Sequence, residues 1–268
     1  MPDVSREDVM VYQGRTRDKV TDWTPFQGER AELELFILLD DSPNASRGTQ
    51  LEDIREFIMA QPAATRVGVA YMQVGSPQIA QALTTDHAAA AKAMRVTLSN
   101  LASSASPYVS LSELIKKWPQ GSARREVVMV SNGIDHEWNG NPAKGGTFDD
   151  PYVDSAVEQA QRAGIVVFTV STSGGNDESS GSMMRAKNYL SEVAGETGGG
   201  AYYQESGTPV SIAPYLKDTT QQLSRQYLLT FLAKPEKKAG MQGVKIKTEV
   251  PHVRLVSADR VYVSSAAQ

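Results

Sequence analysis

The sequence LELFILLDDSPNAS, residues 33–46, decides the fold of this 268-residue chain. Its first seven residues are almost continuously apolar, and two acids and several short polar residues follow them. Such an apolar run is typical of a strand that is buried on both faces of a parallel sheet. The polar residues then form the loop at the carboxyl end of the strand, where open α/β sheets bind their ligands. Asp40 and Ser42 can place two oxygens at this edge, and hard cations are bound by oxygens.

Strand-like and helix-like segments alternate from residue 33 to residue 226. This order predicts a Rossmann-like, doubly wound α/β fold in which helices cover both faces of a mostly parallel sheet. Gly75-Ser76-Pro77 turns the second strand back on itself, so the segment 66–83 is expected to be an antiparallel hairpin at one edge. The predicted strands are 33–39, 66–74, 78–83, 126–130, 165–170 and 201–203, and the predicted helices are 49–61, 86–98, 110–118, 151–163, 183–194 and 212–227.

The two ends of the chain lie outside this alternation. Residues 8–23 form a predicted hairpin around Gly14, and only strands are predicted from residue 227 onward. An isolated hairpin is only marginally stable in water, so we expect the terminal strands to pair with one another. The predicted organisation is a main domain, 31–226, and a small β appendage made of 1–30 and 227–268.

Composition excludes several classes of protein. A formal net charge of -4 argues against a general nucleic-acid binder. No apolar run approaches the roughly 20 residues that span a bilayer, so no membrane insertion is expected. The chain has no cysteine, which excludes disulfides and thiolate metal sites and leaves the compartment open. The polar start Met1-Pro2-Asp3-Val4 does not match a signal peptide.

Three features in this order resemble the von Willebrand factor A domain. They are the strand that ends in 40–44, the antiparallel hairpin after the first helix, and the strand that ends in Ser131-Asn132-Gly133. Segments nearer the ends resemble a narrower group, the VWFA-related domain family abundant in Acidobacteria; they are 7–14, 197–199, 226–229 and 244–247. The resemblance covers nearly the whole chain and implies a Rossmann-like fold with a role in protein–protein adhesion.

The resemblance also implies a metal-ion-dependent adhesion site. In that family, D-x-S-x-S in a first loop, a threonine in a second and an aspartate in a third bind Mg²⁺ or Mn²⁺, and an acidic side chain of the partner completes the site. Asp40 and Ser42 match this pattern here. Asn44 replaces the second serine and could still ligate through its carbonyl oxygen, while Asn132 stands where the aspartate is expected. Asp41 is expected to point away, because successive strand residues face opposite sides.

The site implied by the resemblance is therefore degenerate, with Asp40, Ser42 and Asn44 as the metal ligands. The threonine should fall within 106–110, and the alignment of the following helix places Val109 there. Asp135 is a possible substitute for the missing acid. The alternative is that Asp40, Ser42 and Asn132 hydrogen-bond one another and cap their loops without a metal.

The loop after the strand 126–130 is rich in acids and carries a tryptophan. Trp138 is a candidate partner contact, because tryptophan is enriched at interface hot spots. Asp135 together with Asp149 and Asp150 makes a calcium site conceivable, although the spacing matches no EF-hand. The alternative is an exposed loop in which Asp150 begins the next helix.

Two further readings of the chain are open. The glycine-rich loop 171–182 would bind an anion or nucleotide if the chain were an α/β enzyme, but it lacks a phosphate-binding motif, and no G-x-S-x-G is present. The strands between Lys234 and Arg260 carry seven Lys or Arg, so they could dock an acidic partner in a metal-independent scaffold.

The reading that we favour is a non-catalytic, secreted or periplasmic domain that binds another protein. Its expected ligand-binding residues are Asp40, Ser42, Asn44, Asn132, Asp135 and Trp138, with Mg²⁺ or Mn²⁺ as the possible cofactor.

Overall fold

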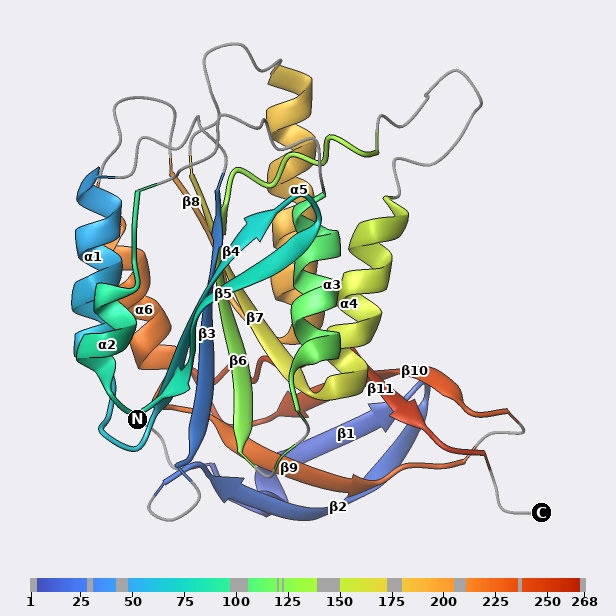
Figure 1. Ribbon diagram of the computed structural model, residues 1–268. Helices are drawn as coiled ribbons and strands as arrows, with labels where there is room; N and C mark the ends of the chain where they lie inside the picture. The colour runs from blue at the N-terminus through green and yellow to red at the C-terminus, as the bar shows by residue number, and fades with distance from the viewer. Residues whose placement is uncertain are drawn as a thin grey trace.

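The structure is a computed structural model that describes residues 4–27, 31–41, 48–96, 106–119, 121, 123–138, 150–172, 180–204, 211–235 and 238–265. Two sheets are present in this part of the chain, one of six strands and one of five (Figure 1). We call them the main sheet and the terminal sheet.

The main sheet has the strand order β5-β4-β3-β6-β7-β8. Counted along the chain from β3, this is the 3-2-1-4-5-6 order of doubly wound folds. All neighbours are parallel except β5, which runs antiparallel to β4 at one edge. The predicted fold class is therefore confirmed. The strands are β3 (Leu33–Asp40), β4 (Arg66–Gln73), β5 (Ser76–Thr84), β6 (Arg124–Ser131), β7 (Ile165–Ser171) and β8 (Ala201–Tyr203).

Strand β3 lies at the centre of the main sheet, and all of its residues are buried. Leu35, Ile37 and Leu39 face one apolar core, whereas Phe36 and Leu38 face the other. The strand that decides the fold therefore contributes to both cores, as its continuous apolar run predicts.

Helices cover both faces of the main sheet (Figure 1). α1, α2 and α6 pack on one face, and α3, α4 and α5 pack on the other. No helix among the described residues is long and apolar enough to cross a membrane. The helices are α1 (Gly48–Met59), α2 (His87–Lys92), α3 (Pro107–Lys117), α4 (Pro151–Ala163), α5 (Ser180–Thr197) and α6 (Ala213–Leu223).

Several helix boundaries differ from the prediction, among them the end of α6, which lies at Leu223 and not at residue 227. α2 ends at Lys92, several residues earlier than expected. α3 begins at Pro107, because Ser106 accepts a hydrogen bond as its N-cap and proline is favoured at the first helical position. α5 continues through Gly195 and stops only before Gly198, whose φ of +87° ends the helix in the left-handed region.

The terminal sheet joins the two ends of the chain in the order β11-β10-β1-β2-β9. All of its neighbouring strands are antiparallel, so it is the predicted β appendage. In Figure 1 it lies below the amino-terminal ends of the main strands, opposite to the edge where ligands are expected. The strands are β1 (Val9–Gln13), β2 (Thr16–Pro25), β9 (Tyr227–Leu232), β10 (Gly240–Thr248) and β11 (Arg260–Val263).

Candidate functional site

A small hollow lies at the carboxyl edge of the main sheet, where β3 and β6 end. Asp40 and Asn132 line it from the strand ends, and Ser106 and Ser110 line it from the start of α3. Its volume is about 20 Å³, which is room for one water-sized occupant. The remaining lining residues are Met72, Val74, Gly75, Pro107, Ile134 and His136.

Asp40 is held firmly in this hollow. Only 6% of the residue is exposed, and its Oδ2 accepts a hydrogen bond of 3.0 Å from Ser131 Oγ. Ser131 Oγ in turn accepts a 3.0 Å hydrogen bond from the backbone N–H of Gly133. The carboxylate therefore takes its position from the neighbouring strand, and this chain of hydrogen bonds shapes the loop after β6.

The side chain of Asn132 forms a hydrogen bond within the same loop. Its Oδ1 accepts a 2.9 Å hydrogen bond from the backbone N–H of Ile134, which is the geometry of an Asx turn. Loop capping, the alternative weighed for this residue, is thus present in the structure, and Asn132 lines the hollow as well. The amide side chain brings oxygen but no charge to the place where the family pattern has an aspartate.

Two serines of the second loop were not singled out from the sequence. Ser106 Oγ accepts a 3.4 Å hydrogen bond from the N–H of Val109 and so caps α3. Ser110 is 1% exposed, and its hydroxyl has no hydrogen-bond partner in the part of the chain that the structure describes. Ser110, one turn into the helix, lines the hollow instead of Val109. The sequence signal that could have found these serines is Ser106-Pro107 before a helical pattern, because serine followed by proline is typical of an N-cap and the first helical position.

Asp41 points away from the hollow, as strand alternation predicts. Its carboxylate is 1% exposed and forms an ion pair of 2.9 Å with Arg95. Gln73 Nε2 donates a further hydrogen bond of 2.7 Å to it. The hydrogen bonds that Arg95 donates to the Asp41 carboxylate raise the pKa of Arg95, which remains charged. Asp41 is therefore part of the framework that supports the site.

The remaining predicted residues are placed as follows. Asp135 is not among the residues that line the hollow; its Oδ1 accepts hydrogen bonds from the N–H groups of Glu137 and Trp138, at 2.8 and 2.9 Å. Trp138 is 37% exposed. Ser42 and Asn44 lie outside the described residues. Within the described residues, no group of three or more His, Cys, Asp and Glu side chains is gathered as a metal site.

Comparisons with known proteins agree with this topology. No family model matches the chain, and no curated protein matches it. Among solved structures, the pilus adhesin SpaC from Lactobacillus rhamnosus GG is similar with a TM-score of 0.53 and 11% identity, covering 81% of this chain and 34% of that chain. The strand order, the antiparallel edge and this likeness together decide the fold. The chain has a von Willebrand factor A-like fold.

Two further solved structures are similar to this chain, with TM-scores below 0.5. The vWF domain of the pilus tip protein Mfa5 from Porphyromonas gingivalis has a TM-score of 0.48 and 12% identity, covering 76% of this chain and 96% of that chain. The manganese-loaded TRAP protein of Plasmodium vivax has a TM-score of 0.45 and 10% identity, covering 97% of this chain and all of that chain, 100%. At these identities the comparison concerns the fold alone.

The oxygens that line the hollow are of the kind that binds a hard cation, but they bring little negative charge. Asp40 supplies the one carboxylate that lines the hollow, and Ser106 and Ser110 supply hydroxyls. The unpartnered hydroxyl of Ser110 is the observation that fits a ligand best, because a buried polar group without a partner is costly. Mg²⁺ depends on carboxylate charge and on retained water, so binding through this set would be weak.

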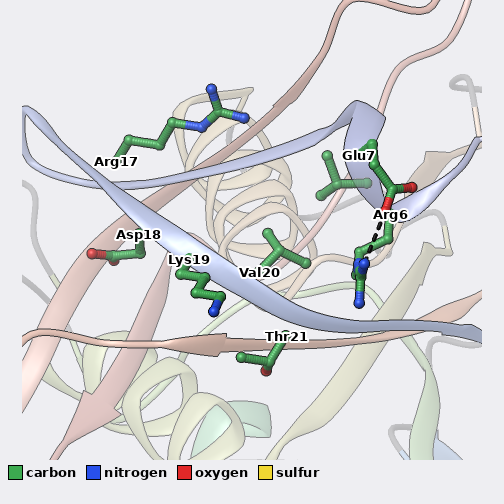
Figure 2. A pocket seen from close by; sticks show the side chains of 8 residues that line it. Arg6, Glu7, Arg17, Asp18, Lys19, Val20 and Thr21 are labelled. Atoms are coloured by element: carbon green, nitrogen blue, oxygen red, sulfur yellow. Dashed lines mark hydrogen bonds and ion pairs between the residues drawn. The ribbon is translucent and has the colours of Figure 1, made fainter.

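A second, larger cavity lies in the terminal sheet. It measures about 690 Å³ and lies beside β2 and the short 3₁₀ turn Arg6–Asp8 (Figure 2). Arg17, Asp18 and Lys19 alternate in sign along its wall. None of the predicted site residues that the structure describes lines it, and β1 and β2 lie at the opposite end of the molecule from the carboxyl ends of β3 and β6 (Figure 1).

Proposed function

We propose that this chain is a non-catalytic, adhesion-type domain that binds another protein through the carboxyl edge of its main sheet. The observation that carries this proposal is the hollow in which Asp40, Asn132, Ser106 and Ser110 meet. Three segments that are distant in the sequence, the end of β3, the start of α3 and the loop after β6, bring these oxygens to one point, at the edge where this class of sheet binds ligands.

A weakly held Mg²⁺ or Mn²⁺ is the proposed cofactor at this point. Asp40 would supply the charge, and Ser42 and Asn44 are the proposed ligands from the first loop. The acidic side chain of a partner protein would add the second negative charge that Asn132 does not supply. Trp138, on the exposed surface of the same edge, is the proposed apolar contact with that partner.

We place the domain outside the cytoplasm, in a secreted or periplasmic protein. The similarity in fold to the pilus adhesin SpaC supports this placement, although it covers only 34% of that chain.

Titration calorimetry of the chelator-treated protein with Mg²⁺ and Mn²⁺ tests the proposed cofactor. Asp40→Asn keeps an acceptor for Ser131 Oγ and removes the charge, so it should abolish saturable binding while the domain stays folded. Glu137→Ala is the matched control, because it removes an exposed carboxylate from the adjacent loop and should leave binding unchanged.

Absence of binding in the wild-type protein would refute the proposed cofactor. A screen for protein partners would then separate the two modes of docking. Partner binding that survives chelation but is lost at high salt would point to the basic strands β10 and β11, because salt screens exposed charges. Partner binding that requires the metal and Asp40 would support the proposal.

A further inference from the structure

The buried Asp150 and the partly buried Asp135 form a pair of carboxylates beside the hollow. Asp135 follows β6, and Asp150 is the N-cap of α4; the carboxyl end of β6 and the start of α4 lie in the upper half of the molecule in Figure 1. The two side chains are within hydrogen-bonding reach of each other, and Asp150 is only 1% exposed. Fourteen residues of sequence separate the two acids.

Each carboxylate uses one oxygen and leaves the other without a donor. Asp135 Oδ1 accepts from two backbone N–H groups, and Asp150 Oδ1 accepts a 2.9 Å hydrogen bond from the N–H of Tyr152. The Oδ2 atoms of both residues are buried and have no hydrogen-bond partner among the described residues. Backbone donors therefore orient both side chains so that the unused oxygens remain in the interior.

No neighbouring group within the described residues neutralises this pair. Neither acid takes part in an ion pair there. The nearby hydroxyl of Tyr108 donates to the carbonyl oxygen of Gly133 at 2.8 Å, so it is not available to the carboxylates. Burial, followed by the charges of Asp135 and Asp150, raises the pKa of Tyr108, so it stays neutral.

The two carboxylates could share a proton only at acidic pH. Burial is the main cause that raises the pKa of Asp150 to about 6, with Asp135 as a further cause. Above that pH the buried side chain of Asp150 carries a negative charge next to the side chain of Asp135. Burial of unpaired charge is costly, whereas carboxylate oxygens with water or carbonyl oxygens are the usual ligands of Ca²⁺.

We propose that the Asp135–Asp150 pair binds a Ca²⁺ ion that ties the segment after β6 to the start of α4. This site is separate from the hollow at Asp40, so it stands whether or not the hollow binds Mg²⁺. Ca²⁺ suits the pair better than Mg²⁺, because it accepts irregular coordination and Mg²⁺ demands a near-ideal octahedron. With two carboxylates, the dissociation constant is expected at ~10⁻⁴ to 10⁻³ M, the range of weak extracellular sites.

The test is Ca²⁺ titration of the chelator-treated protein at pH 7.5, followed by calorimetry and by melting temperature. The wild type should bind Ca²⁺ saturably, and its melting temperature should rise with Ca²⁺ concentration, since a ligand of the native state stabilises it. Asp135→Asn and Asp150→Asn each keep their Oδ1 acceptor and their fold, and each should weaken binding at least tenfold.

Two control variants locate the ion. Asp154→Asn removes an exposed carboxylate from the first turn of α4 and should bind Ca²⁺ like the wild type. Asp40→Asn should also retain Ca²⁺ binding, which separates this site from the hollow. Loss of binding in Asp40→Asn alone would mean that the ion occupies the hollow, and the proposal would be wrong.

A shared proton is the outcome that would overturn the calcium site directly. In that case Ca²⁺ would change neither the heat signal nor the melting temperature, and Asp150→Asn would remove a stabilisation seen only below about pH 6.

Discussion

At the scale of single residues, Val74 is held in an unfavourable backbone conformation at the rim of the hollow. Val74 and Gly75 form the two-residue turn between β4 and β5, with φ of 47° and 70°. Positive φ at both positions is typical of a type I′ turn, in which asparagine followed by glycine is preferred. A β-branched residue there is an outlier and costs stability.

We therefore expect Val74→Asn to stabilise the protein by about 1 kcal/mol, because asparagine adopts positive φ more readily. Urea unfolding followed by circular dichroism measures the change. Val256→Asn is the control, because Val256 is also exposed and is not among the described residues with positive φ. An equal gain in both variants would show that reduced surface hydrophobicity, and not the turn, is the cause.

At the scale of elements, the junction between α5 and β8 depends on a close approach of two backbones. A Cβ atom at Gly199 would collide with the carbonyl oxygen of Val167 on β7. Gly198, with φ of +87°, ends the helix just before it. These glycines allow β8 to reach the edge of the main sheet next to β7.

Gly199→Ala should destabilise the domain by more than about 2 kcal/mol, because the backbone of β7 cannot move aside cheaply. Gly195→Ala should instead stabilise it by up to about 1 kcal/mol, since Gly195 lies inside α5 and its Cβ would meet nothing. Thermal unfolding of the two variants measures the contrast. A small effect at Gly199 would contradict the close packing of α5, β7 and β8.

At the scale of the whole molecule, a buried ionic cluster links the main sheet to the terminal sheet. Glu126 is fully buried in β6, and its Oε1 lies 3.3 Å from Arg124 Nε. Arg124 donates to the carbonyl oxygen of Leu223 at 2.8 Å and stacks over Phe26, at the end of β2. The N–H of Phe26 bonds to the carbonyl oxygen of Gln226, just before β9. The cluster therefore connects the two sheets.

This cluster makes stability depend on pH. Burial raises the pKa of Glu126 from 4.5 to about 7, against an opposing effect of Arg124. Between those values the native state binds more protons than the unfolded state, so the free energy of unfolding falls as pH rises. The stabilisation that comes from protonated Glu126 is on the order of 3 kcal/mol. It is fully present below about pH 4.5 and is lost as the pH rises through about 7.

Glu126→Gln should flatten the decline in the free energy of unfolding between pH 6 and 8. This range lies mostly above the raised pKa of Asp150, about 6, so the titration of Asp150 contributes little to it. Urea midpoints measured across that range for both proteins give the difference. Parallel curves for variant and wild type would show that Glu126 does not titrate there.

The sequence alone determined the order of elements and the fold class. The continuous apolar run before Asp40 predicted a central strand, and alternation within it predicted that Asp41 would turn away from the site. Local signals also placed the caps at Asp86 and Asp150 correctly. These features depend on residues close together in the chain, so pattern and spacing suffice to read them.

Only the tertiary structure decided which side chains meet. It brought Ser110 into the hollow beside Asp40, paired Asp135 with Asp150, and ended α5 at Gly198 instead of Gly195. These outcomes depend on contacts between segments that are distant in the chain, and the packing of helices on the sheet fixes them. Spacing in one sequence carries no information about such contacts, because the same local signals suit several spatial arrangements.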